Sequence, residues 1–284
     1  PCTVTSQAVL GIHGEGVTAI DLATHEARNL TTPDAGLSLG FDCTRTFGDR
    51  LIAFSPMGIS IADLVRHTFV SIQDTTIPMV DGDRALYGIG TGLLELTPGR
   101  DEARQIFTAP AAIERLAVSG HWVVMVLVDN RILRLDRSTG DLAETVLHTS
   151  PETFGVTPEG EAWLTQENLL LSWSGSELRL VAPFRNRIEV AFRWKTHSFV
   201  KLVDGSLWDV ADGIPQQRFV EGLHGLQVGG SIAISHSPQQ ITTHFLASGE
   251  TIARDFEAIG AVKAFEEGRG LLVQTSRWAL VFRD

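Results

Sequence analysis

The chain has 284 residues, is 43% hydrophobic and carries a formal net charge of −11, so it holds enough apolar side chains for a large core. Its acidity disfavours general binding to nucleic acid or anionic membrane, because contacts with phosphate need clustered cations. Its two cysteines exclude a disulfide-dense module and a multi-cysteine zinc site. We therefore expect neither nucleic acid nor a membrane as a partner, although local basic patches remain possible.

The expected location is cytoplasmic, with the alternative that an upstream segment has been removed, because the chain begins at Pro1 without Met. Residues 1–5 have neither a basic segment nor the long apolar run of a signal peptide, and no stretch of the chain is apolar over a membrane-spanning length. Nearly all basic residues are arginine, with lysine only at positions 195, 201 and 263. We interpret this bias as a property of a GC-rich, bacterial genome.

One element recurs along the chain: a β-rich run, a short turn and a second β-rich run. In chain order these predicted hairpins span residues 8–21, 51–63, 85–96, 122–136, 162–173, 198–210, 232–245 and 271–282. A turn centred on glycine precedes most of them, as at Gly48, Gly82, Gly120 and Gly160. Another short β segment precedes that turn, and a further one follows the hairpin. The repeating unit is therefore four short strands, with a period of about 36 residues.

This pattern predicts an all-β fold, a β-propeller of about eight four-stranded antiparallel blades, with residues 1–284 forming a single domain. No stretch shows a helical period of apolar residues. The last unit ends after its third strand, so its fourth strand is either missing or supplied by the N-terminus. The alternative is a propeller of seven blades with a stray hairpin.

Three segments resemble known propeller families. Residues 135–142 resemble the Asp-x-x-Thr-Gly turn of PQQ-like propellers, and residues 156–165 resemble the Pro-Asp-Gly-x-x-Trp-Phe-Thr unit of NHL-like and streptogramin-lyase-like propellers. Leu207-Trp208-Asp209 is similar to the end of the third strand in a WD40 repeat. Each motif occurs only once or twice, so the resemblance implies the architecture of a β-propeller repeat protein and no catalytic residue.

Several side-chain pairs fall on equivalent positions of the repeat, which explains them without chemistry. Asp81 and Asp83 flank a glycine like a calcium loop, but their position predicts a tight turn between strands. His25 and His67 follow equivalent third strands, and Cys2 and Cys43 lie on equivalent first strands. We expect no metal site here. The cysteines are either two reduced thiols, which we favour, or a disulfide.

A loop ahead of the sixth unit is the predicted binding site, because arginine and aromatic residues are common at protein interfaces. We place it with neighbouring hairpin turns on one face of the fold. The candidate binding residues are Phe184, Arg185, Asn186, Arg187, Arg131 and Asn168. The segment that begins at Arg193 is expected on the opposite face.

The sequence contains no nucleophile elbow, no phosphate-binding glycine loop and no His-Glu-x-x-His grouping, so no catalytic residue and no cofactor is predicted. The leading hypothesis is a non-enzymatic scaffold or binding module that presents a loop face to a protein or peptide partner. The alternatives are an enzyme with its site in the central channel, such as a lyase or hydrolase, and a small-ligand or carbohydrate binder. The partner and the oligomeric state stay open.

Overall fold

A computed structural model describes residues 2–4, 8–13, 16–21, 23–29, 43–47, 50–55, 58–63, 68–81, 83–97, 100, 102–194, 197–219, 225–229, 232–236, 239–245, 250–255, 259–265, 270–275 and 279–283. These residues form eight antiparallel sheets, here called sheets 1 to 8 in chain order. The chain divides into two compact units, of which unit 1 holds residues 1–150, 155–162 and 173–177 and unit 2 holds the rest. Residues of sheet 5 are divided between the two units.

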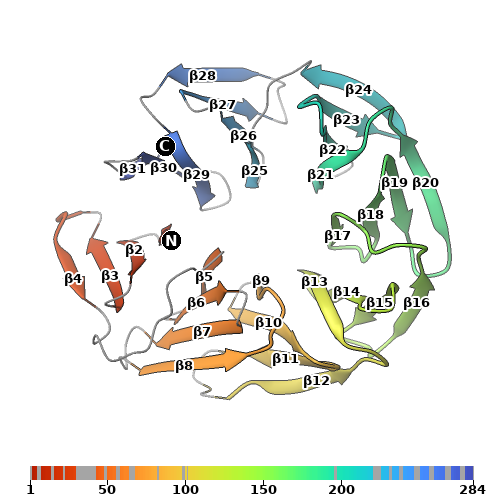
Figure 1. The fold of residues 1–284 in the computed structure, drawn as a ribbon, viewed down its shortest axis with the longest axis horizontal. Helices are drawn as coiled ribbons and strands as arrows, with labels where there is room; N and C mark the ends of the chain where they lie inside the picture. The colour runs from red at the N-terminus through yellow and green to blue at the C-terminus, as the bar shows by residue number, and fades with distance from the viewer. Residues whose placement is uncertain are drawn as a thin grey trace. The chain divides into compact units, whose positions relative to one another are not determined.

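Sheets 1 to 4 belong to unit 1, and each has four strands in chain order (Figure 1). Their strands are β1 (Cys2–Val4), β2 (Ala8–His13), β3 (Gly16–Asp21) and β4 (Ala27–Asn29) in sheet 1; β5 (Cys43–Phe47), β6 (Arg50–Ser55), β7 (Gly58–Asp63) and β8 (Thr68–Gln73) in sheet 2; β9 (Met79–Asp81), β10 (Arg84–Ile89), β11 (Gly92–Leu96) and β12 (Arg104–Thr108) in sheet 3; and β13 (Ile113–Ser119), β14 (Trp122–Leu127), β15 (Arg131–Asp136) and β16 (Leu142–Val146) in sheet 4.

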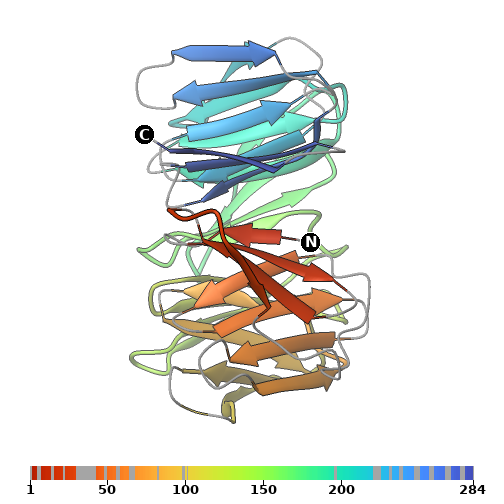
Figure 2. The same ribbon diagram turned by 90° about the vertical axis from the view of Figure 1, so that its left-hand side faces the viewer.

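Sheets 5 to 8 follow the same order, and the antiparallel course of sheet 7 can be followed from the side in Figure 2. Their strands are β17 (Phe154–Val156), β18 (Ala162–Gln166), β19 (Leu169–Trp173) and β20 (Leu178–Pro183) in sheet 5; β21 (Ile188–Trp194), β22 (His197–Leu202), β23 (Leu207–Ala211) and β24 (Ile214–Phe219) in sheet 6; β25 (Gly225–Gly229), β26 (Ile232–His236), β27 (Gln240–Phe245) and β28 (Thr251–Asp255) in sheet 7; and β29 (Ile259–Phe265), β30 (Gly270–Thr275) and β31 (Ala279–Arg283) in sheet 8.

The predicted repeat is confirmed at the level of strands. All eight predicted hairpins are present, each as the second and third strands of its sheet. Sheet 8 has three strands among the described residues, and the N-terminal strand β1 pairs with β2 of sheet 1, so it is not the fourth strand of sheet 8. The prediction of a single domain stays a prediction.

Burial differs between the strands of a sheet for a physical reason. The middle strand β14 reads Trp-Val-Val-Met-Val-Leu and is buried from its second residue onward, as expected for a strand covered on both faces. The fourth strand β16 alternates exposed and half-buried residues, which is typical of an edge strand with one face in water. The core between sheets 3 and 4 includes Leu86, Leu93, Met125 and Leu133, all fully buried.

First strands of successive sheets lie beside one another within unit 1. Strand β1 contacts β5, β5 contacts β9, and β9 contacts β13. In unit 2, β25 likewise contacts β29. The turns between first and second strands are fixed by glycines with positive φ, 55° at Gly120 and 86° at Gly160, a conformation that favours glycine. No described helix is long and apolar enough to cross a bilayer.

Candidate functional site: an arginine-lined pocket around Glu95

Three sheets carry a charged residue at the same place on the third strand, opposite the third residue of the second strand. These residues are Glu95, Arg134 and Asp209, and each contacts the first residue of the second strand, which is Arg84, Trp122 and His197, respectively. The repeat therefore places a polar pair at the same end of sheets 3, 4 and 6.

The pairs differ in chemistry. The Arg134 guanidinium lies 4.7 Å from the Trp122 ring centroid, a cation–π contact, and it donates to the Gly160 and Ser174 carbonyls. In sheet 6, His197 Nδ1 lies 2.8 Å from Asp209 Oδ1. In both pairs the side chains contact each other within their own sheet, so we interpret them as structural links.

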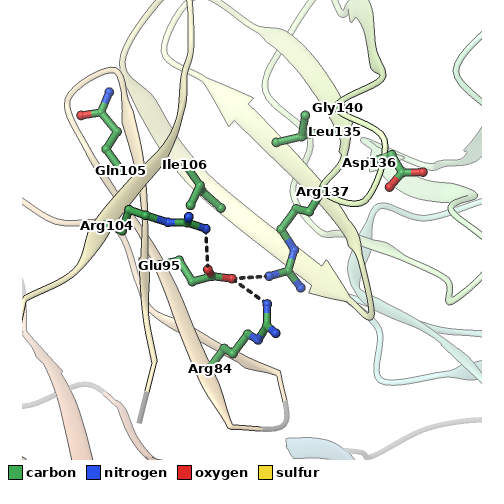
Figure 3. Close-up of a pocket in the computed structure, with 9 residues that line it drawn as sticks. All are labelled: Arg84, Glu95, Arg104, Gln105, Ile106, Leu135, Asp136, Arg137 and Gly140. Carbon is green, nitrogen blue, oxygen red and sulfur yellow. Dashed lines mark hydrogen bonds and ion pairs between the residues drawn. The ribbon is translucent and has the colours of Figure 1, made fainter. Parts of the chain in front are cut away.

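Glu95 of sheet 3 is unusual because three arginines converge on its buried carboxylate (Figure 3). Arg137 Nη1 donates to Oε1 at 2.7 Å, Arg84 Nη1 lies 3.2 Å from the same oxygen, and Arg104 Nη2 lies 3.5 Å from Oε2. Arg137 also pairs with Asp81 at 3.3 Å, and Arg84 lies 3.7 Å from Asp83, so the three guanidinium groups face three carboxylates. Among the described residues, Arg104 has Glu95 as its one ion-pair partner.

Arg137 is the structural member of the cluster. It lies in the turn after β15, and its guanidinium also reaches Asp81 Oδ2 at 3.3 Å and the Gly120 carbonyl. Its backbone N–H donates to the His121 carbonyl. Its side chain is only 12% exposed, so its donors face protein groups, and it joins sheet 3 to sheet 4.

Arg84 and Arg104 are the accessible members. Their side chains are 50% and 67% exposed, respectively, and both line a cavity of about 320 Å³ between sheets 3 and 4 (Figure 3). Glu95 and Asp136 are the carboxylates of this lining, against three arginines. Guanidinium groups recognise carboxylates and phosphates through paired N–H donors. The exposed guanidinium groups of Arg84 and Arg104 are therefore the groups of this cavity that can bind an anion.

Asp136 is already engaged by its own turn. Its Oδ1 accepts hydrogen bonds from the Ser138 hydroxyl at 2.6 Å and from the Ser138 N–H at 2.7 Å. These hydrogen bonds, that of the Ser138 hydroxyl first, hold the pKa of Asp136 below its usual value. The Gly140 N–H closes the turn on the Asp136 carbonyl, as the resemblance to the Asp-x-x-Thr-Gly turn implies.

A second cavity of about 430 Å³ shares Arg84 and Arg137 with this pocket and is also lined by Asp81, Asp83 and His121. Asp81 and Asp83 were predicted to be turn residues. Asp81 ends β9, and its carboxylate pairs with Arg137, while Asp83 lies 3.7 Å from Arg84. Among the described residues, no three His, Cys, Asp or Glu side chains group as metal ligands.

The predicted loop of residues 184–187 joins β20 to β21, as expected. Phe184 is 7% exposed and packs edge-on against Trp208 at 6.1 Å, so it belongs to the core of unit 2. The Asn168 side chain donates to the Phe184 carbonyl at 2.7 Å, which places the two predicted residues together. Both are structural supports of the loop.

The remaining loop residues differ in their contacts. Asn186 Nδ2 donates to Asp204 Oδ2 at 2.6 Å, and Arg187 Nε lies 3.5 Å from Glu152 Oε1. Arg185 is exposed and makes no hydrogen bond or ion pair with another described residue. Arg185 is therefore the predicted residue with donors available to a partner.

Arg131 and the loop of residues 184–187 belong to different units. Arg131 lies in unit 1, beside the hairpin turn of β14 and β15, and its Nη2 pairs with Asp129 Oδ2 at 2.7 Å. Glu144 lies 3.8 Å from its Nη1. Two carboxylates thus occupy Arg131.

Three further predicted features are only partly described. His25 has a φ of 61° in the turn after β3, where the Asp21 carboxylate accepts two backbone N–H groups. It takes the place that Gly140 has after β15, which agrees with its interpretation as a repeat-equivalent turn residue. His67 and the side chains of Cys2 and Cys43 lie outside the described part of the chain.

No family model matches the chain, and no curated protein matches its sequence. Among solved structures, the computationally designed Ika8 protein, a designed propeller, is similar over 100% of this chain and 95% of its own, with a TM-score of 0.73 at 12% identity. The WD40 β-propeller domain of Doa1 is similar over 85% of this chain and 95% of its own, with a TM-score of 0.57 at 11% identity. Likeness at such identity is informative about the fold alone, and the chain has a β-propeller fold.

Proposed function

We propose that the chain is a non-enzymatic binding module for a protein or peptide partner, and that a carboxylate of this partner binds to Arg84 and Arg104. The β-propeller fold is that of a scaffold or binding module in general. The observation that supports the proposal is the convergence of three arginines on the buried carboxylate of Glu95.

The role of Glu95 in this proposal is to position the two accessible arginines. Its Oε1 holds Arg84 at 3.2 Å, and its Oε2 holds Arg104 at 3.5 Å. A guanidinium that is already oriented loses less rotamer entropy when it binds an anion. An acidic side chain of a peptide could thus form two pairs without disturbing the link between Arg137 and Glu95.

The loop of residues 184–187, in unit 2, is a separate candidate contact area. Arg185 would pair with a carboxylate of the partner, because its guanidinium has no described partner within the chain. Phe184, Asn168, Asn186 and Arg187 would hold the loop in shape.

The experiment uses a fluorescein-labelled hexaglutamate peptide and fluorescence anisotropy at low salt. We expect the full chain to bind hexaglutamate in a saturable manner and not to bind the hexaglutamine analogue. The double variant Arg84→Gln/Arg104→Gln should lose affinity at least fivefold, which corresponds to about 1 kcal/mol of binding free energy. Arg254→Gln, at an exposed arginine of β28, is the matched control and should bind like the parent. Equal affinity of the double variant and the control, in folded proteins, overturns the proposal.

A further inference from the structure

A second cavity in unit 1 has a different chemistry from the arginine-lined pocket. It lies between sheets 2 and 3 and has a volume of about 510 Å³. Its walls are mainly aliphatic, formed by Ile61, Ile72, Ile89, Leu94 and Leu96. Protein interiors hold few voids larger than a water molecule, whereas mainly apolar cavities of this size with a few polar groups are typical of small-molecule sites.

Tyr87 supplies a polar group in this cavity that the fold itself does not use. The residue is 1% exposed, and it lines the cavity from the middle of β10. Its hydroxyl forms no hydrogen bond with any described residue. The fully buried side-chain atoms of the described residues that lack a hydrogen-bond partner do not include this hydroxyl, so its oxygen is accessible from the cavity.

The protonation of Tyr87 favours a donor role. Burial raises the pKa of its hydroxyl to about 12, so the phenol stays neutral at physiological pH. A neutral phenol readily donates to an oxygen acceptor. A carbonyl, ether or hydroxyl oxygen of a molecule bound in the cavity would therefore accept a hydrogen bond from Tyr87.

The charged groups of the lining argue against an anionic ligand. Arg50 and Asp63 are both buried, and the Arg50 Nε lies 3.9 Å from Asp63 Oδ2. Glu102 adds a second carboxylate at an exposed position. One cation against two carboxylates leaves no excess of positive charge for an anion, and burying an ion without a partner is costly.

We propose that the cavity between sheets 2 and 3 binds an uncharged, mainly apolar small molecule whose oxygen atom accepts a hydrogen bond from Tyr87. The aliphatic walls bind the body of the molecule, and Tyr87 orients its oxygen. The site is separate from Arg84 and Arg104, so it stands or fails independently of the proposed partner binding.

The test compares benzophenone with diphenylmethane, which has the same two rings but no oxygen. Equilibrium dialysis with the full chain should give tighter binding of benzophenone, by about two- to tenfold, the range expected for one hydrogen bond. Tyr87→Phe removes only the hydroxyl and should abolish this difference. Because the chain has a single tyrosine, a ¹³C-tyrosine label gives one ring signal, which benzophenone should shift in a saturable manner.

A second variant keeps the test meaningful if Tyr87→Phe folds poorly. Ala103 is half-buried in the cavity wall, and Ala103→Phe should fill the space and weaken both ligands at least fivefold. Equal affinity for both ligands in the parent chain, an unmoved Tyr87 signal, or unchanged binding by folded Ala103→Phe each overturns the proposal.

Discussion

Arg137 Nη1, in the turn after β15, donates to Oε1 of Glu95, the fourth residue of β11, at 2.7 Å. Both side chains are nearly buried, at 12% and 7% exposure. This contact joins sheets 3 and 4 and holds the Glu95 carboxylate among three arginines. The same carboxylate orients Arg84 and Arg104, so one residue links the packing of two sheets to the proposed binding surface.

Replacing Glu95 should destabilise the fold. Glu95→Gln leaves the Arg137 guanidinium without its carboxylate, and we expect a loss of about 1–3 kcal/mol in the free energy of unfolding. The measurement is the urea midpoint, followed by circular dichroism. Glu144→Gln is the control, because its exposed pair with Arg131, at 3.8 Å, should contribute less than about 0.5 kcal/mol. Similar losses for both variants are incompatible with a structural role of Glu95.

Two glycines test how tightly the turn before β18 packs against Trp122 of β14. A Cβ on Gly160 would lie 2.3 Å from the Trp122 ring, whereas a Cβ on Gly140 would meet nothing within 4 Å. Both residues have a positive φ, 86° and 82°. Gly140→Ala should therefore lower the free energy of unfolding only by the cost of placing alanine at a positive φ, about 1 kcal/mol. Gly160→Ala should lower it clearly more, because its Cβ would also clash with Trp122. The measurement is the melting temperature of both variants. Equal melting temperatures would contradict the close packing of Gly160 against Trp122.

Acid should weaken the turn at Asp136. Its pKa is lowered in the folded chain, chiefly because the Ser138 hydroxyl donates to it. Because this pKa is lowered, ionised Asp136 contributes to the free energy of unfolding. The contribution is fully present above the pKa of the unfolded chain, about 3.9, and is lost as the pH falls through the pKa of the folded chain. Asp136→Asn keeps an acceptor but does not titrate.

The measurement compares the free energy of unfolding of Asp136→Asn with that of the parent chain between pH 6 and pH 2.5. We expect the parent to lose more stability than the variant below about pH 4. The exposed Asp141, whose carboxylate makes no hydrogen bond among the described residues, provides the control Asp141→Asn. A parent and an Asp136→Asn variant with parallel acid profiles would show that this carboxylate does not stabilise the turn.

The loop of residues 184–187 gives a prediction about the natural partner. Reversing Arg185 and Arg187 should weaken binding of a partner purified from the native source, and Arg185→Glu alone should account for most of the loss because Arg187 pairs with Glu152. Calorimetry with the purified partner measures this, with Arg254→Glu as the control. If both reversals leave the affinity of the folded chain unchanged, the loop is not a binding site.

The sequence predicted the strands well because each depends on local pattern. The alternation in β16 and the apolar run in β14 follow directly from burial on one face or two. Gly120 and Gly160 mark turns that need a positive φ. These signals lie within a few residues of one another, so they can be recognised without knowledge of the fold.

The candidate site was harder to predict because its residues come from two sheets. Arg84, Glu95, Arg104 and Arg137 span more than one repeat, and no local motif connects them. A signal did exist: Glu95 interrupts an otherwise apolar third strand at the position of Arg134 in the next sheet. Phe184, a predicted binding residue, has its ring buried against Trp208, a contact between residues far apart in the sequence.

The binding of a carboxylate by Arg84 and Arg104 is tested most directly by NMR of arginine side chains. Hexaglutamate is titrated into the full chain labelled with ¹⁵N-arginine, and the Nε–H signals are assigned by Arg84→Lys, Arg104→Lys and Arg254→Lys. We predict saturable shifts of the Arg84 and Arg104 signals and an unmoved Arg254 signal. Shifts of equal size at all three arginines, or none at Arg84 and Arg104, would contradict the proposed site.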